Sequence, residues 1–210
     1  MSKSADFTHL HVHSEFSLLD GMSKIESLLD ETQALGMDSI AITDHGALYG
    51  TVQFVQAATK RGIKPIIGVE TYVARRGMAD KEGKADQQPF HLVLLATNAT
   101  GYRNLCRLVT DAHLDGMYYK PRIDLAHLAK HSEGLIGLSG CLNGEIARAL
   151  EVDDWAHARD LAGRYGEIFG RGRFYLEVQD HGLPEQRRLN EQLFKLGPEV
   201  GLPLVLTNDL

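Results

Sequence analysis

The chain has 210 residues, of which 43% are hydrophobic and 24% charged, a balance that excludes a disordered chain. Its formal net charge of −6, with ten histidines counted as neutral, excludes a nucleic-acid binder that relies on a basic patch alone. Two cysteines are too few for a disulfide framework, and the sequence shows neither a membrane-spanning apolar run nor a signal peptide, so we expect a cytoplasmic protein with no membrane partner.

Short apolar runs alternate with amphipathic helical stretches, and this alternation predicts consecutive βα units of an α/β fold. The seven expected strands are Phe7–His13, Ser39–Thr43, Pro65–Val73, Phe90–Ala96, Leu135–Ser139, Arg173–Gln179 and Leu202–Thr207.

Helices are expected between these strands, with one exception. Arg75–Pro89 is polar, contains glycine and has no helical period, so it reads as a loop. The first expected helix opens at a Ser23/Glu26 capping box and closes at Gly36. Two further helices run over Thr51–Arg61 and Gly101–Leu114, and another begins at an Asp124 cap. Helical segments also occupy parts of 144–169, and the last helix runs from Pro184 to near Gly197.

His11 and His13 are two residues apart on an expected strand, so their side chains point to one face, as two imidazoles that bind one metal must. A lone His-x-His is also what two half-exposed strand histidines look like. The metal interpretation therefore depends on what else lies nearby.

Ligand-type residues follow nearly every expected strand, where the functional groups of parallel α/β folds collect. They are Asp20, Asp44, His45, Glu70, Cys141, His181 and Asp209. Each has an ordinary explanation alone: Asp20 as a turn residue, Asp44 as a helix cap, Cys141 as core and Glu70 as a surface charge. Their joint placement favours a metal site.

His91 begins its expected strand rather than ending it. Because no helix precedes that strand, the third and fourth strands can form an antiparallel hairpin, which would bring His91 to the same end as the other ligands. A histidine at a strand edge is the alternative. Imidazole and carboxylate ligands with one thiolate suit zinc, manganese or iron better than calcium, and metals a few ångströms apart catalyse phosphoester hydrolysis.

Five segments, in order, closely resemble the PHP (polymerase and histidinol phosphatase) domain: HLHVHSEFSLLDG, AITDHGALYG, KPIIGVETYV, FHLVLLA and GLSGC. The resemblance is closest to the version at the N-terminus of bacterial replicative DNA polymerase III alpha subunits, supported by GYRNLCRLV, GMYYKPRID, HGLPEQ and LTND. It covers essentially the whole chain. It implies a distorted seven-stranded (β/α)7 barrel, with residues 1–210 forming one PHP domain from a longer polymerase.

The resemblance also implies a cluster of two to three divalent metals, Zn, Mn or Fe. His11, His13 and Asp209 would bind the first metal, and Glu70 would bridge to a second, completed by His91 and Cys141. Asp20 and His45 would hold a third with a histidine that the family places two residues beyond Asp209. The sequence stops at Leu210, so eight of nine ligands are expected and the third metal should be held weakly.

The resulting functional expectation is a metal-dependent 3′→5′ exonuclease that proofreads for the attached polymerase, with His11, His13, Asp20, His45, Glu70 and Asp209 as catalytic residues. Lys120, Arg122 or His181 would contact the phosphate or the DNA, although a Lys/Arg pair on a loop is usually just solvated. The expected partners are a single-stranded DNA 3′ end, the rest of the polymerase chain and other replisome subunits. Two alternatives stay open: a phosphomonoesterase or pyrophosphatase of the histidinol phosphatase type, and a metal-stabilised scaffold.

Overall fold

A computed structural model describes residues 7–18 and 20–210. Among these residues, no helix combines the length and apolar character needed to cross a membrane. The elements are α1 (Ile25–Ala34), β1 (Ser39–Ile42), α2 (Thr51–Lys60), β2 (Lys64–Val73), α3 (Gly83–Asp86), β3 (Phe90–Ala96), α4 (Ala99–Leu114), β4 (Arg122–Ile123), α5 (Leu125–Lys130), β5 (Leu135–Leu138), α6 (Glu145–Glu151), α7 (Trp155–Phe169), β6 (Phe174–Val178), α8 (Pro184–Val200) and β7 (Leu204–Leu206).

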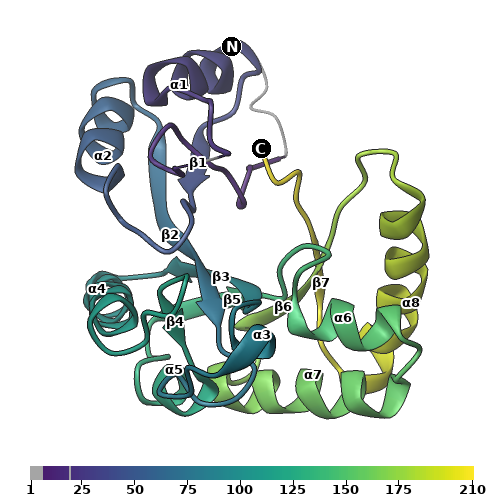
Figure 1. Ribbon diagram of the computed structural model, residues 1–210. Helices are drawn as coiled ribbons and strands as arrows, with labels where there is room; N and C mark the ends of the chain where they lie inside the picture. The colour runs from purple at the N-terminus through teal and green to yellow at the C-terminus, as the bar shows by residue number, and fades with distance from the viewer. Residues whose placement is uncertain (1–6, 19) are drawn as a thin grey trace.

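The strands form one curled sheet in the order β1-β2-β3-β5-β6-β7, with β4 paired to β2 (Figure 1). β2 is ten residues long, and it pairs parallel with β1 through its first half and antiparallel with β3 through its second. The antiparallel β2–β3 hairpin confirms the expectation drawn from the missing crossover helix. The expected α/β class and distorted seven-stranded barrel are confirmed.

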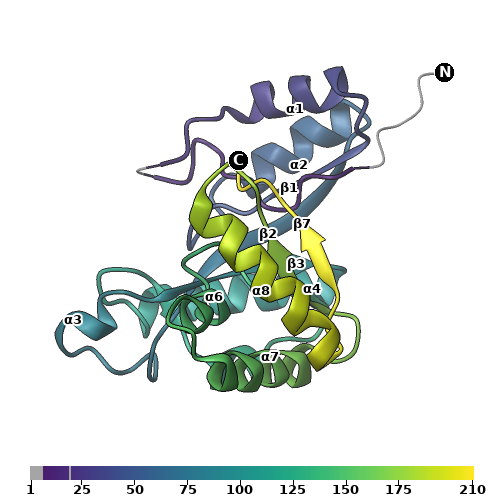
Figure 2. The same ribbon diagram turned by 90° about the vertical axis from the view of Figure 1, so that its right-hand side faces the viewer.

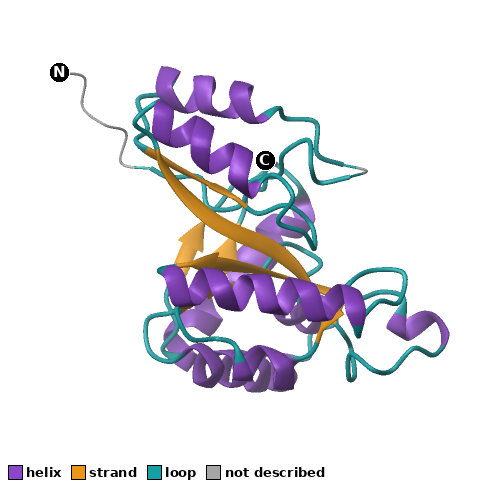
Figure 3. Cartoon of the chain, turned by 90° about the vertical axis from the view of Figure 1, so that its left-hand side faces the viewer, coloured by secondary structure: helices purple, strands orange, loops and turns teal. Residues whose placement is uncertain are grey.

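Helices cover the outer face of the sheet, with α1 and α2 at one end and α4, α7 and α8 around the other (Figures 2 and 3). One apolar core joins β2, β3, β5 and β6 to the helices from α4 onward, and a second joins β1 to α1 and α2. A third, small cluster on the concave side consists of Ala41, Val93, Leu95 and Leu138. The sheet that carries the site described below is therefore packed against apolar side chains on both of its faces.

The expected first strand, Phe7–His13, is wrong as a regular strand, because this segment is extended but forms no regular ladder. The carbonyls of His9 and Val12, three residues apart, accept from the amides of Ala41 and Thr43, which are two apart. The N–H of Val12 donates to Thr43 Oγ1 instead of a carbonyl. The extra residue interrupts the pairing as a bulge does.

The far edge of the same segment contacts the end of the chain. The N–H of His13 donates to the carbonyl of Leu210 at 2.6 Å, and the N–H of Leu210 donates to the carbonyl of His11 at 3.2 Å. The segment thus lies between β1 and the residues that follow β7, and it closes the barrel.

Three other sequence expectations need correction. The capping box does not form, because α1 begins at Ile25 with Lys24 at the N-cap and no side-chain cap. The helix beginning at Pro184 continues past Gly197 to Val200. The expected loop 75–89 contains the short helix α3, which polar contacts hold: the Asp86 carboxylate accepts from the Arg76 guanidinium and from the Glu82 amide.

Arg122 in β4 is fully buried and binds backbone carbonyls only. Its guanidinium donates to the carbonyls of Gly116, Asp86, Met78 and Asp80 at 2.8–3.2 Å. It therefore anchors two loops to the sheet. A guanidinium committed in this way presents no surface to a phosphate, so the expectation that Arg122 contacts DNA is wrong.

Replacing Arg122 with methionine removes every donor to these four carbonyls while keeping much of the side-chain volume. We expect Arg122→Met to lower the free energy of unfolding by about 3 kcal/mol, because buried acceptors lose their partners. Urea denaturation followed by circular dichroism measures this loss. The matched variant at an exposed arginine, Arg171→Met, should change the value by no more than about 0.5 kcal/mol, and equal effects of the two variants would contradict the anchoring role.

Candidate metal centre

The candidate ligands meet on the concave side of the sheet, around a cavity of about 490 Å³. Seven of the eight expected ligands line this cavity: His13, Asp20, His45, Glu70, His91, Cys141 and Asp209. The eighth, His11, lies beneath them with no exposed surface.

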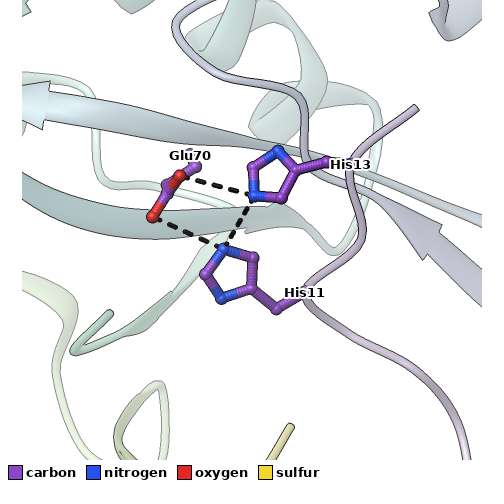
Figure 4. Close-up of side chains that lie close together, drawn as sticks. All are labelled: His11, His13 and Glu70. Atoms are coloured by element: carbon purple, nitrogen blue, oxygen red, sulfur yellow. Dashed lines mark hydrogen bonds and ion pairs between the residues drawn. The ribbon is translucent and has the colours of Figure 1, made fainter. Parts of the chain in front are cut away.

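One group of ligand atoms centres on His11 and His13 (Figure 4). Their Nε2 atoms lie 3.3 Å apart, and Glu70 faces both, with Oε1 3.4 Å from His11 Nε2 and Oε2 3.5 Å from His13 Nε2. Asp209 Oδ1 approaches the same two nitrogens at 3.3 and 3.2 Å. Asp209 has a φ of +48°, a backbone conformation that is uncommon outside glycine and concentrated at functional sites.

A second group of ligand atoms lies next to the first and shares Glu70 with it, since the rings of His13 and His45 stack with centroids 4.2 Å apart. His45 Nδ1 lies 2.5 Å from Glu70 Oε2, and His91 Nδ1 lies 2.8 Å from Glu70 Oε1. Asp20 extends the group outward, with Oδ2 2.8 Å from His45 Nε2 and with 57% of its side chain exposed. Because Glu70 belongs to both groups, its carboxylate is the centre of the whole arrangement.

The local chain geometry explains how these residues meet. His45 lies in the loop after β1, past Thr43 and Asp44, and forms an isolated parallel bridge with Glu70 of β2, while His91 of β3 is paired with Tyr72. The next residue, Gly46, has a φ of +59°, and a Cβ there would lie 2.8 Å from the Pro121 side chain. Only glycine fits this turn beside His45.

The histidines of the first group are oriented from behind. Glu177 Oε1 lies 2.7 Å from His11 Nδ1, and Ser17 Oγ lies 2.8 Å from His13 Nδ1. Ser17 in turn donates to the buried carboxylate of Asp44. Contacts of this kind fix the tautomer and direction of metal-binding imidazoles, and here they leave both Nε2 atoms turned toward Glu70.

Sequence reasoning missed Glu177 and Ser17. Glu177 is buried in the middle of β6, where it also accepts from the Gly140 amide and from Gln179 Nε2. A single glutamate inside an otherwise apolar strand was the signal that could have revealed it. Asp44 was noticed, but as a ligand candidate or a helix cap rather than as the partner of Ser14 and Ser17.

Two buried atoms at the centre have no hydrogen-bond partner among the described residues, namely His45 Nδ1 and Glu70 Oε2. They lie 2.5 Å apart, yet their alignment does not satisfy hydrogen-bond geometry. Buried polar atoms are nearly always paired, so two facing orphans indicate a missing partner. A divalent cation satisfies imidazole and carboxylate atoms together, and the residues present therefore fit a metal.

The electrostatics agree with a site built for positive charge. Burial disfavours a charged His11, but Glu177 and Glu70 outweigh this effect and raise the pKa of His11 well above its usual value. Burial also opposes a charged His45, and Glu70 and Asp20 raise its pKa. Despite its burial, Glu70 has a pKa held well below the usual range by His11 and the other imidazoles.

Cys141 is partly buried at the cavity wall, and burial together with the nearby Glu70 raises the pKa of its thiol to about 12. It is therefore a neutral thiol without a cation beside it, and a bound metal would deprotonate it. It could complete the group around His45 and His91.

The residues expected to contact substrate are separated in the structure. His181 lines the cavity, with Nδ1 3.0 Å from Gln186 Nε2 and with Nε2 on the carbonyl of Asn208. Lys120 lies near the cavity rather than in its lining, with Nζ 5.2 Å from the ring centroid of Tyr72, which stacks on His45. Arg122 faces the protein interior, as described above.

Glu177→Gln should weaken zinc binding about 10- to 100-fold. The neutral amide would hold the His11 ring less firmly, and the negative charge of the Glu177 carboxylate beside His11 Nδ1 would be lost. Competition with a chromogenic chelator measures the apparent Kd. Glu167→Gln, at an exposed glutamate on α7, is the matched control and should leave the Kd unchanged. A wild-type Kd for Glu177→Gln would exclude a positioning role.

Because nearby carboxylates raise the pKa values of His11 and His45, a metal that binds these rings competes with protons up to a higher pH than it would at ordinary histidines. Zinc binding should therefore release protons, and the apparent affinity should fall as the pH decreases. Calorimetric titration in two buffers of different ionisation enthalpy gives the number released. No buffer dependence at pH 7 would contradict the assignment of these rings as ligands.

Comparisons with known proteins place the chain in a family. The model for the PHP domain matches residues 9–181. The DNA polymerase III subunit alpha of Thermus aquaticus is 47% identical over 218 residues, which cover 100% of this chain and 17% of that protein. The corresponding subunit of Treponema pallidum is 44% identical over 205 residues, covering 97% of this chain and 18% of that protein. The chain thus spans less than a fifth of these relatives.

Solved structures share the fold at low sequence identity. A two-domain protein from Bacteroides vulgatus, containing a predicted PHP-like metal-dependent phosphoesterase, matches with a TM-score of 0.57 and 16% identity over 97% of this chain and 51% of that one. An amidohydrolase from Chromobacterium violaceum, with bound sulfate and no metal, matches with a TM-score of 0.56 and 16% identity over 97% and 87%. With the family match spanning most of the barrel, this chain belongs to the PHP domain family.

Proposed function

We propose that this chain is the PHP domain of a bacterial DNA polymerase III alpha subunit, and that it hydrolyses phosphodiesters at a centre of two to three divalent metals. The most plausible biological substrate is the 3′ end of single-stranded DNA held by the polymerase, which would make the domain a proofreading 3′→5′ exonuclease. Relatives at 44% and 47% identity support the polymerase assignment.

The observation that carries the proposal is the buried Glu70 carboxylate, which belongs to both groups of ligand atoms: Oε1 faces His11 and His91, and Oε2 faces His13 and His45. One carboxylate between two sets of imidazoles suits two metal ions a few ångströms apart. The exposed Asp20 beside His45 would hold a third ion less firmly, because both it and its ion would remain in water.

Divalent metals in such a centre lower the pKa of bound water and neutralise charge on a phosphoryl group. The protein residues position that chemistry. Glu177 and Ser17 fix the directions of the His11 and His13 rings, and the barrel wall excludes water from His11 altogether. Asp20 and His181 stand at the mouth, where a leaving group can be protonated from solvent.

The cavity mouth also offers contacts for a substrate larger than phosphate. Met22 lines the cavity and is 91% exposed, so its side chain is available to a base or sugar. Lys120 approaches from the Tyr72 side with its ammonium group over that ring. An exposed apolar contact and one cation suit a nucleic-acid strand better than a small phosphomonoester.

The direct test incubates the protein, loaded separately with Zn²⁺, Mn²⁺ or Fe²⁺, with a single-stranded oligonucleotide carrying a 5′ label. We expect stepwise shortening from the 3′ end, loss of both bound metal and cleavage in His13→Ala, and wild-type cleavage in the exposed control His157→Ala. Cleavage that survives in a metal-depleted His13→Ala preparation would reveal a contaminating nuclease and overturn the proposal.

The same assay separates the alternatives. Release of inorganic phosphate from monoesters or pyrophosphate, without shortening of DNA, would assign a histidinol phosphatase type of activity. Metals that raise the melting temperature while neither substrate is cleaved would assign a scaffold that supports the polymerase and its partner subunits.

Lys120→Ala should raise KM for the oligonucleotide about tenfold and leave kcat nearly unchanged, because it removes one charge-assisted phosphate contact. Lys120→Arg should restore most of the affinity. Lys84→Ala, at an exposed lysine in α3, is the control for a general loss of positive charge. A KM for Lys120→Ala equal to that of Lys84→Ala would exclude the contact.

A further inference from the structure

A second group of metal-ligating side chains lies outside the cavity, where α4 meets α5. It consists of Asp111, His127 and His131, each of which offers a ligand atom within 4.8 Å of the others. None of the three lines the cavity around Glu70. These three residues therefore do not belong to the candidate metal centre around Glu70.

The three side chains are arranged much like the ligands of a bound metal. Asp111 Oδ2 lies 3.0 Å from His127 Nε2, and the rings of His127 and His131 have centroids 4.8 Å apart. His127 lies in α5, and His131 follows the helix directly as its C-cap residue. Tetrahedral zinc with bonds of about 2.1 Å places its ligand atoms roughly 3 to 4 Å from one another, so small side-chain adjustments would close the site.

The ring of His127 has an unsatisfied atom directed at this group. Its Nε2 is buried and lacks a hydrogen-bond partner among the described residues, although Asp111 Oδ2 is only 3.0 Å away. The backbone holds the ring in this place, because the Asp124 side chain caps α5 by accepting from the His127 amide. A buried imidazole nitrogen beside a carboxylate without hydrogen-bond alignment has the arrangement of a ligand pair.

Arg107 is the cation that now contacts Asp111, with Nε 2.7 Å from Oδ2. It is an i,i+4 partner on α4, and 64% of its side chain is exposed. The guanidinium is on the exposed side of this pair, so a divalent metal that takes its place beside the buried Asp111 carboxylate can displace it into water.

We propose that Asp111, His127 and His131 form a second metal site, separate from the Glu70 centre, that binds Zn²⁺ or a similar transition metal with water in the fourth position. The site would tie the end of α4 to α5. The segment between them contains Lys120 and Arg122, so bound metal would close and stiffen this segment. We assign it a structural role, because it joins two elements and none of its three side chains lines the cavity around Glu70.

The test compares the zinc content of the wild-type protein with that of His131→Gln and Asp111→Asn after equilibration with zinc and gel filtration, measured by mass spectrometry of the metal. Each variant should carry one zinc fewer per chain, and the rise in melting temperature caused by added zinc should be smaller. His157→Gln, at an exposed histidine on α7, is the control and should match wild type in both measurements.

A crystal soaked in zinc supplies an independent measurement, since anomalous scattering should show a peak within bonding distance of all three side chains. Absence of this peak while the Glu70 centre is filled would overturn the proposal, as would equal zinc content in wild type and His131→Gln. The soak still decides if Asp111→Asn fails to fold. Cleavage of DNA by His131→Gln should remain, so failure of this inference is distinguishable from failure of the proposed function.

Discussion

The buried carboxylate of Glu70 carries a negative charge that must be compensated, and the residues around it at this end of the barrel provide that compensation. With 1% of its side chain exposed, it has lost nearly all hydration, and an isolated charge in such a place would cost several kcal/mol. Four imidazoles surround it: His11 and His13 from the N-terminal segment, His45 from the loop after β1, and His91 from β3. The N-terminal segment, β1 and β3 are placed so that they bring these rings to the one carboxylate, which β2 carries.

The same requirement extends outward in layers. Glu177 and Ser17 fix the directions of the His11 and His13 rings, and Ser17 itself is hydrogen-bonded to the buried Asp44. Four buried side-chain atoms among the described residues have no hydrogen-bond partner, and two of them, Glu70 Oε2 and His45 Nδ1, lie at the centre of this arrangement. An ion bound between these two atoms would supply the missing interactions.

Much of this arrangement could be predicted from sequence, because strand-end chemistry and the family motifs locate ligands without coordinates. The hairpin that brings His91 to the site followed from a missing crossover helix. The predictions from sequence failed where tertiary contacts, rather than the local sequence, determine the structure. Phe7–His13 has a strand-like sequence, but an extra residue and a threonine side chain break its ladder. Arg122 has the sequence context of a surface cation, yet burial and four carbonyls make it part of the core, which no local pattern reveals.

The closure of the barrel by the N-terminal segment has a consequence for how the protein is made. His11 depends on Glu177, 166 residues away along the chain, and His13 and His11 are hydrogen-bonded to Leu210. Contacts of such long sequence separation form late and slowly, because most of the chain must be ordered before they are favourable. During synthesis, the first ligands would leave the ribosome long before their partners. The arrangement of the candidate ligands would therefore arise only as the barrel closes, late in the synthesis and folding of the chain.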